Sequence, residues 1–413
     1  MYLKFFGRAK FPKSNPASFT LIVFLWIAFN ASAALFAQSP AYLENAPDHE
    51  CKDGLSCAAR RIEAFRFAQN RRLGANSFYK TASALQVSAS NGIPGINALR
   101  YDLWLDWREI LNKTADTGAA RHYEGVQTIT ILLDSLWNEH SPILRLHASE
   151  RHLRIDSAFL VSPLDAKKER ARAEFDLDNN AFRPDAPREI LALRLPRLYK
   201  QGDTLALAIH FTHIADSNDE DGTGFLLFAK NRLGAVRRGN DSVFIPERLA
   251  YTMSQPYGAR RWMPCHDVPF DKAFVSVQIR VPSDYTAVAN GLLEDSTLQS
   301  DGSRLWRWRH RFPAAPYLVA ATASVYDSYR EWHKKSSVPN DSIPIDHWFW
   351  REDDTDLPLN NNNYNVRASF QITEGTIEAF ERLFGDYPFE RYGHVVVQPF
   401  FAGGMEHQTI STI

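Results

Sequence analysis

The chain has 413 residues, of which 45% are hydrophobic and 23% charged, and its formal net charge is −1. This length accommodates two or three domains with separate cores, and the composition is that of an ordinary folded protein. The near-zero charge gives no overall field that would point to nucleic acid or an anionic membrane as a partner. An aromatic content of 13%, with ten tryptophans, favours β-rich layers over a helical bundle.

The first 37 residues have the pattern of a secretory signal. Basic residues precede an uncharged apolar run from about residue 19 to residue 37, and small residues near its end offer cleavage sites. The basic residues are Lys4, Arg8, Lys10 and Lys13. We therefore expect an exported protein, whether periplasmic, secreted or at the cell surface. The apolar run also approaches the length that spans a bilayer, so an uncleaved anchor, and with it a membrane association, is the alternative.

Residues 38–95 are polar and irregular, and they predict an N-terminal extension with one helix between residues 58 and 72. Cys51 and Cys57 are close enough in sequence to close a small disulfide loop in an oxidising compartment. The remaining cysteine, Cys265, is interpreted as a small buried hydrophobic residue.

From Ile96 onward the hydrophobic pattern has a period of two. Short apolar alternations are separated by polar turns, which predicts many half-buried strands and no helices of the length that a doubly wound fold needs. The alternating residues include Leu103, Leu105, Ile129, Ile131, Leu205, Leu207, Ile209, Val275, Val277 and Ile279. The fold class is therefore mainly β: an antiparallel, saddle-like β-sandwich over residues 96–350.

Two charged segments of this domain have a functional and a structural interpretation. Arginines alternate with tryptophans from Leu305 to Arg311, a pattern that could stack on single-stranded nucleic acid, but an arginine stripe on an outer sheet face is favoured. The acidic stretch 216–222 suggests calcium, yet it lacks the register of a calcium-binding loop, so a solvated hairpin loop is favoured.

A second, α-containing domain is predicted after an Asp- and Asn-rich loop at residues 351–363. Residues 365–413 are assigned to the beginning of this domain. Its helix is expected to bury one apolar face and to end at Gly385, a C-cap glycine, before a strand at residues 394–398. The apolar face consists of Phe370, Ile377, Phe380, Leu383 and Phe384.

The strand leads into paired glycines, Gly403 and Gly404, and then into Met405 and Glu406. A strand edge without side chains can accept an extended peptide by main-chain pairing. Glu406 is then placed to meet a cationic group, and a free α-amine is protonated at neutral pH because its pKa is about 8. The alternative is a Gly-Gly bend followed by a solvated glutamate.

Several ordered motifs resemble the aminopeptidase N family of zinc metallopeptidases, which includes membrane alanyl aminopeptidase-like gluzincins. Gly403-Gly404-Met405-Glu406-His407 is similar to the family's Gly-Ala/Gly-Met-Glu-Asn signature. Upstream, residues 254–256 are similar to its glutamine-containing substrate loop, 264–269 to its Pro-Cys-x-Asp-x-Pro element, and 316–320 to its inter-domain strand. The resemblance covers about residues 96–413, the N-terminal portion of such an enzyme.

The resemblance implies that residues 365–413 begin an α+β, thermolysin-like catalytic domain. It also implies a site for a peptide substrate with a free N-terminus. Glu406 would hold the α-amine, Gln255 would reach the same amine or the first side-chain pocket, and Met405 would line that pocket. The backbone at Gly403 and Gly404 would align the scissile peptide. His407 stands where the family has asparagine, and it either supports Glu406 or contacts the peptide.

The family takes its zinc from a His-Glu-x-x-His helix and a later glutamate. None of the thirteen histidines in the chain begins that motif. We therefore assign no catalytic residue and no metal ligand, and expect zinc in the complete enzyme but neither catalytic zinc nor peptidase activity in this chain alone. The alternative function is a non-enzymatic, secreted β-rich module that binds peptides or a protein partner.

Overall fold

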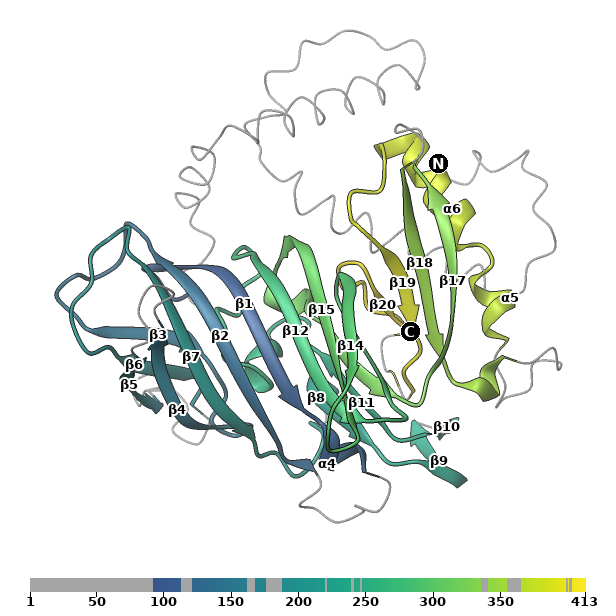
Figure 1. The fold of residues 1–413 in the computed structure, drawn as a ribbon, viewed down its shortest axis with the longest axis horizontal. Coiled ribbons are helices and arrows are strands. Elements are labelled where there is room, and N and C mark those ends of the chain that lie inside the picture. Colours follow the sequence, from purple (N-terminus) through teal and green to yellow (C-terminus); the bar gives the residue numbers. More distant parts are fainter. Residues whose placement is uncertain are drawn as a thin grey trace, which may run out of the picture.

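A computed structural model describes residues 92–413 apart from 113–120, 162–167, 176–187, 220, 239–240, 246, 336–340, 355–364, 399 and 401–402. Strands dominate, as the period-two pattern predicts, and they form one large sheet and three smaller ones (Figure 1). The predicted signal, the N-terminal helix, Cys51 and Cys57 lie outside the described residues. Within them, no helix is both long and apolar enough to cross a membrane.

The largest sheet has ten strands. In spatial order they are β14 (Leu292–Leu298), β15 (Ser303–Ala314), β12 (Ala273–Pro282), β1 (Ile96–Asp106), β2 (Tyr123–Leu133), β7 (Thr204–His213), β4 (Leu153–Val161), β5 (Lys168–Phe175), β6 (Ile190–Arg194) and β3 (Ile143–His147). The predicted antiparallel pairing is confirmed for every adjacent pair but one. β1 and β12 run parallel, with Leu103 opposite Val277. These two strands are separated by β2 to β11, and such a long crossover permits parallel pairing, whereas hairpin neighbours are antiparallel.

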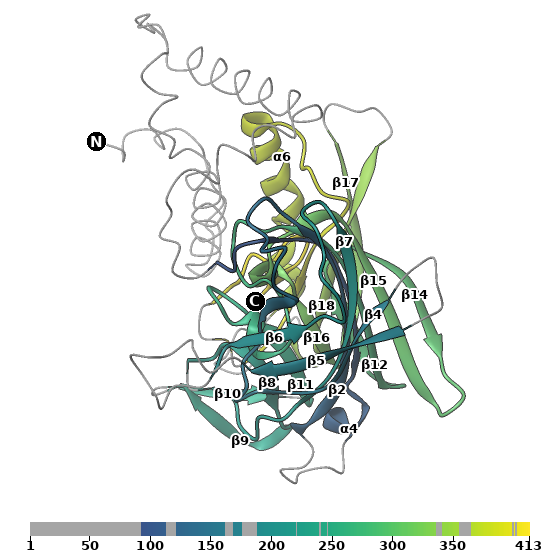
Figure 2. The ribbon, with the colours of Figure 1, turned by 90° about the vertical axis from the view of Figure 1, so that its left-hand side faces the viewer.

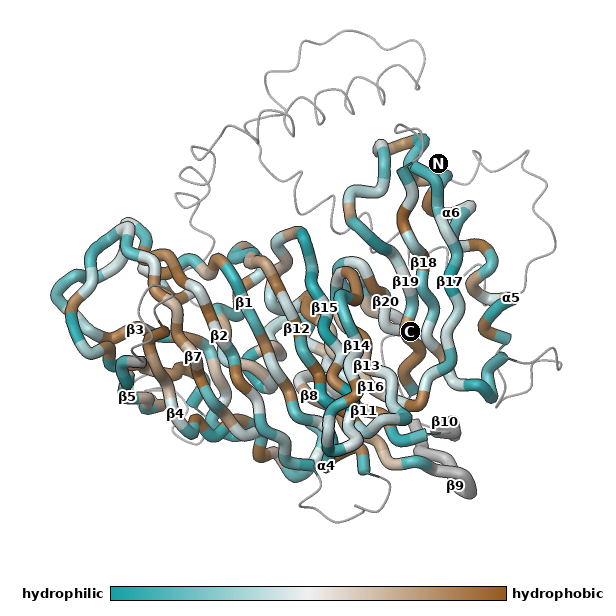
Figure 3. Tube along the Cα trace, in the orientation of Figure 1, coloured by the Kyte–Doolittle hydropathy of each residue, from teal (hydrophilic) through white to brown (hydrophobic). Residues whose placement is uncertain are grey.

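Alternation along the central strands explains why this sheet buries one face. In β2 every second residue from Tyr123 to Leu133 is buried, including Ile129 and Ile131, and the residues that alternate with them are at least partly exposed. Successive side chains of a strand point to opposite faces, so a period-two sequence covers a core on one side and meets solvent on the other. Figure 3 shows the same alternation of apolar and polar residues along β1, β2 and β12.

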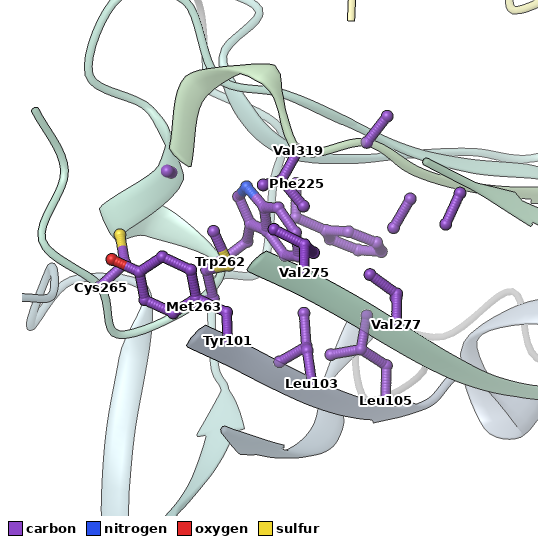
Figure 4. Close-up of a cluster of buried hydrophobic side chains, with 14 of the residues drawn as sticks. Tyr101, Leu103, Leu105, Phe225, Trp262, Met263, Cys265, Val275, Val277 and Val319 are labelled. Atoms are coloured by element: carbon purple, nitrogen blue, oxygen red, sulfur yellow. The ribbon is translucent and has the colours of Figure 1, made fainter. Parts of the chain in front are cut away.

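A second sheet covers the apolar face and completes the sandwich. Its four strands are β13 (Thr286–Ala289), β16 (Ala321–Ser324), β11 (Leu249–Met253) and β8 (Gly224–Phe228). Leu103 and Val277 of the large sheet point toward Phe225 and Trp262 of the covering layer (Figure 4). Figure 2 shows the large sheet curving around the smaller one. Cys265 is fully buried with a free thiol, which confirms its interpretation as a small core residue.

The remaining elements of the sandwich are short. They are the hairpin β9 (Asn231–Arg238) and β10 (Asp241–Ile245), the helix α4 (Arg108–Leu111), and the 3₁₀ turns η4 (Ala259–Arg261) and η5 (Pro316–Leu318).

The C-terminal part is built on a separate sheet of mixed direction. Its strands are β17 (Asp327–Lys334), β18 (Ser342–Phe349), β19 (Tyr392–Val395) and β20 (Ser411–Thr412). β18, β19 and β20 are parallel, and the 3₁₀ turn η6 (Arg351–Asp353) and helices α5 (Val366–Phe370) and α6 (Thr373–Phe384) form the crossover from β18 to β19. The domain border expected at residue 350 therefore falls between two paired strands of one sheet, and this sheet begins at residue 327.

Helix α6 ends at Gly385, whose amide donates to the Glu381 carbonyl with φ +90°, and this confirms the C-cap. The predicted apolar face, however, is only partly correct, because Phe370 and Ile377 are buried but Leu383 and Phe384 are not. Thr373, Ile377 and Glu381 are buried, whereas Leu383 is 54% and Phe384 44% exposed. Two causes explain the difference. First, Phe370 belongs to the separate helix α5. Second, the buried side of α6 is the row Thr373, Ile377 and Glu381, spaced four residues apart, and this row faces β17 because Glu381 Oε1 pairs with His333 Nε2 of that strand (3.1 Å).

Alanine substitutions in α6 test which face is packed. Ile377→Ala is expected to lower the free energy of unfolding by about 2 kcal/mol, since a buried side chain is removed, whereas exposed Leu383→Ala should stay within about 0.5 kcal/mol. Urea midpoints of the two variants provide the measurement. Equal losses would mean that Leu383 packs as Ile377 does.

Candidate functional site

The Gly403–Glu406 segment lies at the outer edge of the C-terminal sheet. Met405 forms an isolated antiparallel bridge with Thr412 of β20, through Met405 N–H to Thr412 O (2.8 Å) and Thr412 N–H to Met405 O (3.0 Å). Gly403 has φ +75° and is exposed, and a Cβ built on it meets no atom within 4 Å. Gly403 therefore has open space beside it among the described residues, whereas a Cβ on Gly404 would lie 3.8 Å from the Thr412 carbonyl oxygen.

This edge presents free main-chain groups outward. In an antiparallel pair, one residue exchanges both hydrogen bonds with its partner, and the residues on either side of it point their N–H and C=O groups the other way. Since Met405 exchanges both bonds with Thr412, the main-chain groups of Gly404 and Glu406 face away from β20. No partner for them is found among the described residues. Such an edge can pair with an extended peptide.

The Glu406 side chain is half-buried beside Tyr317 of η5. Burial raises the pKa of the Tyr317 hydroxyl, and the nearby charge of Glu406 raises it further. In the part of the chain that the structure describes, no cation forms an ion pair with Glu406 and no donor binds its carboxylate. The carboxylate therefore retains its hydrogen-bonding capacity for a cationic ligand.

The residues on either side of Glu406 in the sequence, Met405 and His407, are both buried. Met405 is 1% exposed and belongs to the hydrophobic core, so its side chain does not face solvent where a first side-chain pocket was expected. His407 is 3% exposed, and its Nδ1 lies 3.0 Å from Thr412 Oγ1. Burial lowers the pKa of His407 to about 3, so the imidazole is neutral. His407 therefore contacts Thr412 of the neighbouring strand, and its two expected roles stay predictions.

Gln255 follows β11 and is exposed, in a loop that begins with the cis Gln255–Pro256 peptide. Among the described residues it has no hydrogen bond to the Gly403–Glu406 segment. The strand before this loop is joined to β16, because Thr252 Oγ1 of β11 accepts from Ala321 N–H (3.0 Å). The expected role of Gln255 beside Glu406 therefore stays a prediction.

The Pro264–Pro269 element serves the architecture of the sandwich. Its Asp267 is buried and accepts from Arg260 Nε (3.0 Å). Burial raises the pKa of Asp267, and Arg260 opposes that rise. His266 hydrogen-bonds Asp271, which also accepts from the Ala98 amide (3.0 Å) at the start of β1. The motif therefore holds the end of the large sheet and leaves no charged group for a ligand.

A chain of hydrogen bonds crosses the C-terminal sheet, and no local pattern in the sequence indicates it. At one end, Tyr392 Oη lies 3.0 Å from Ser411 Oγ and 3.4 Å from His394 Nε2. The other ring nitrogen of His394, Nδ1, lies 3.0 Å from His347 Nδ1. At the far end, His347 Nε2 lies 3.3 Å from Glu331 Oε2. Because an ionised carboxylate only accepts, His347 donates through Nε2 and accepts at Nδ1, so His394 donates through Nδ1. Each histidine is neutral in this arrangement.

The zinc that the resemblance implies does not fit the described residues. They contain no group of three or more His, Cys, Asp or Glu side chains that could hold a metal ion. His210 and His213 lie three apart on β7, and only His213 is buried. We therefore derive no catalytic step through a metal from these residues.

The two charged segments of the sandwich are internally paired. Arg307 and Arg309 of β15 bind Asp295 (2.6 Å) and Glu294 (2.9 Å) of the neighbouring strand β14. In the acidic stretch, Asp219 and Asp221 both bind Arg261, at 2.7 and 2.9 Å. These pairs agree with the interpretations as an outer sheet face and as a surface loop.

Comparison with known proteins assigns this architecture to a class. Residues 119–318 match the family described as Peptidase M1 N-terminal domain. Glutamyl aminopeptidase from Bos taurus is 24% identical over 165 residues, covering 40% of this chain and 16% of that protein. Aminopeptidase M1 from Arabidopsis thaliana is 23% identical over 167 residues, covering 40% and 17%.

Solved structures share the fold. A variant of the M1 zinc metallopeptidase from Deinococcus radiodurans has a TM-score of 0.53 and 19% identity, covering 78% of this chain and 61% of that one. Another structure of a variant of that enzyme, bound to Tyr-Ser-Ala, has a TM-score of 0.51. The sandwich is thus a peptidase M1 N-terminal domain. These matches support a relationship of the chain to the N-terminal portion of aminopeptidase N-family proteins, and the chain spans only 16–17% of the length of the aminopeptidases it matches.

Proposed function

We propose that this chain is the N-terminal portion of an exported zinc aminopeptidase, and that Glu406 binds the free α-amine of a peptide substrate. The observation that carries the proposal is the half-buried Glu406 carboxylate, without a cation of its own among the described residues, on an edge whose main-chain groups point outward. A carboxylate in this position forms charge-assisted hydrogen bonds to an ammonium group.

In this proposal, the main chain at Gly404 and the side chains of Glu406 and Gln255 bind different parts of the substrate. The outward groups at Gly404 pair with the peptide backbone, and Glu406 holds the amine, so the first peptide bond lies at a fixed distance from the carboxylate. We assign to Gln255 the binding of the same amine or of the first side chain, as the family resemblance implies. Hydrolysis belongs to the complete enzyme, whose zinc is held by residues other than those described here.

Binding of a tripeptide tests the amine site. The probe is Tyr-Ser-Ala, compared with its N-acetylated form by titration calorimetry on the full chain. We expect the free amine to bind at least tenfold more tightly, and Glu406→Gln to abolish that preference, because a hydrogen bond to a charged group contributes about 1.5–3 kcal/mol.

Glu124→Gln, a substitution on the exposed face of β2, is the matched control and should retain the preference. Equal binding of the two peptides by the unmodified chain would refute the amine site.

Metal analysis tests the second part of the proposal. The purified chain is expected to hold less than one zinc per molecule and to leave an aminoacyl-anilide intact, because no His-Glu-x-x-His motif occurs in its 413 residues. Stoichiometric zinc together with anilide turnover would contradict this.

A further inference from the structure

Asn290 is a buried polar residue whose entire side-chain amide is engaged. It follows β13, is 2% exposed, and donates through Nδ2 to the carbonyl oxygens of Leu318 (2.9 Å) and Gln408 (2.7 Å). Its Oδ1 accepts from the amide of Ala320 (2.7 Å). Both amide hydrogens are thus used, and they join two segments that are about 90 residues apart in sequence.

The two segments are the parts of the molecule that flank the proposed amine site. Leu318 ends η5, the turn that carries Tyr317, and Gln408 lies two residues after Glu406. A single side chain of the sandwich therefore holds the edge of the C-terminal sheet against η5. The raised pKa of Tyr317, caused by burial and then by Glu406, agrees with a carboxylate that lies next to η5.

The residue after Asn290 adds a second tie. Gly291 N–H donates to Thr409 Oγ1 (2.7 Å). Thr409 has φ +73°, in the left-handed region that a β-branched residue rarely adopts, so the surrounding contacts hold it there. The His407 carbonyl accepts from the Ile410 amide (3.1 Å) and closes the turn.

These ties fix Glu406 from both sides. On the N-terminal side, Met405 is held by its bridge to Thr412, and on the C-terminal side Gln408 and Thr409 are held by Asn290 and Gly291. A charged group that binds a ligand by hydrogen bonds needs its position held to within a fraction of an ångström. The backbone around Glu406 is held on one side by its own sheet and on the other side by two residues of the sandwich.

We infer that Asn290 is a positioning residue for the amine site: its amide sets the place of the Glu406 carboxylate relative to η5, so that the site exists only when the two sheets are docked. This inference rests on the proposed function of Glu406. It assigns the selectivity of the site for a free N-terminus partly to a side chain of the sandwich that does not contact the peptide.

Asn290→Asp is the sharpest test, because it retains the acceptor for Ala320 and replaces both donated hydrogens by an acceptor oxygen. Hydrogen exchange of the Met405 and Thr412 amides is expected to accelerate at least tenfold, while β2 amides of the large sheet exchange as before. The preference for Tyr-Ser-Ala over its N-acetylated form should fall at least fivefold.

Asn218→Asp is the matched control. Asn218 also pairs with backbone, donating to the Leu227 carbonyl (3.0 Å) and accepting from the Leu227 amide (2.9 Å), but it lies in the loop at residues 216–222. Its variant should lose stability without changing the exchange at Met405 or the peptide preference. Asn290→Ser, which keeps a single hydroxyl donor, should give intermediate values.

The two readouts separate the possible failures. If the unmodified chain prefers the free amine and Asn290→Asp retains that preference, the positioning role is overturned. If exchange at Met405 and Thr412 is unchanged in Asn290→Asp, it is overturned whatever the peptides do. If the unmodified chain shows no preference for the free amine, the proposed function of Glu406 fails. Accelerated exchange of the Met405 and Thr412 amides in Asn290→Asp would then show only that Asn290 stabilises the structure, and the positioning role would be overturned.

Discussion

Lowering the pH from 7.5 to 5.5 is expected to reduce the free energy of unfolding by about 5 kcal/mol, since four histidines with strongly lowered pKa values are buried in their neutral form. Burial lowers the pKa of His213 and His407 to about 3 and that of His347 to about 4, and it lowers the pKa of His394 well below its usual value. The loss is comparable with the whole stability of many domains.

The sign follows from proton binding. In the unfolded chain a histidine titrates near pH 6.5, so below that pH the unfolded state binds more protons than the folded state. The contribution of each histidine to stability is therefore complete above about pH 7 and is lost as the pH falls toward the folded pKa, by about 1.4 kcal/mol for each pH unit below 6.5. Burial raises the pKa of Asp267 and Glu331, which opposes the trend at lower pH, so the comparison ends at 5.5.

Urea unfolding at pH 7.5, 6.5 and 5.5 measures this dependence. The variant His407→Asn removes one of the four groups and should flatten the dependence by about 1.4 kcal/mol over the range. A stability that stays constant down to pH 5.5 would show that these histidines are not buried in their neutral form.

Gly291→Ala is expected to destabilise the protein by at least about 3 kcal/mol. Gly291 has φ +80°, and a Cβ added to it would lie 2.0 Å from the Arg309 carbonyl oxygen, a backbone atom that cannot move aside without distorting β15. The substitution would also disturb the hydrogen bond from Gly291 to Thr409, and with it the tie to the amine site.

Gly302→Ala separates the steric effect from the backbone effect. Gly302 has φ +82°, close to that of Gly291, but a Cβ there meets no atom within 4 Å. It should cost only about 1 kcal/mol, the penalty of a left-handed conformation. Urea midpoints compare the two variants, and equal losses would mean that the close approach at Gly291 relaxes freely.

Much of the sandwich could be predicted from local pattern. Alternation such as Leu205-Ala206-Leu207 fixes which face of a strand is buried, because consecutive side chains of a strand point to opposite sides. The parallel pairing of β1 with β12 could not be predicted in this way. Apolar and polar residues alternate along both strands, but this alternation does not indicate which distant strand becomes the neighbour. The buried face of α6 could not be predicted from local pattern either, since buried Glu381 is explained only by His333 on another strand.

Some residues of the candidate site could likewise be predicted from the sequence, and others could not. Gly403, Gly404 and Glu406 could be found in the sequence, because paired glycines before a carboxylate form a contiguous motif whose chemistry is local. Met405 was assigned to a substrate pocket, yet its side chain lies in the core. Asn290 could not be found, since nothing in its neighbourhood points to Gln408, 118 residues away.

By itself, the amino-acid sequence determined the strand-rich class, the motifs that resemble the aminopeptidase N family and the carboxylate proposed to bind the amine. These depend on residue type and near-neighbour spacing. Only the tertiary structure decided the parallel β1–β12 pairing, the neutral state of the buried histidines and the ties that hold Glu406. Each of these depends on which distant segments meet, and on how completely they exclude water when they do.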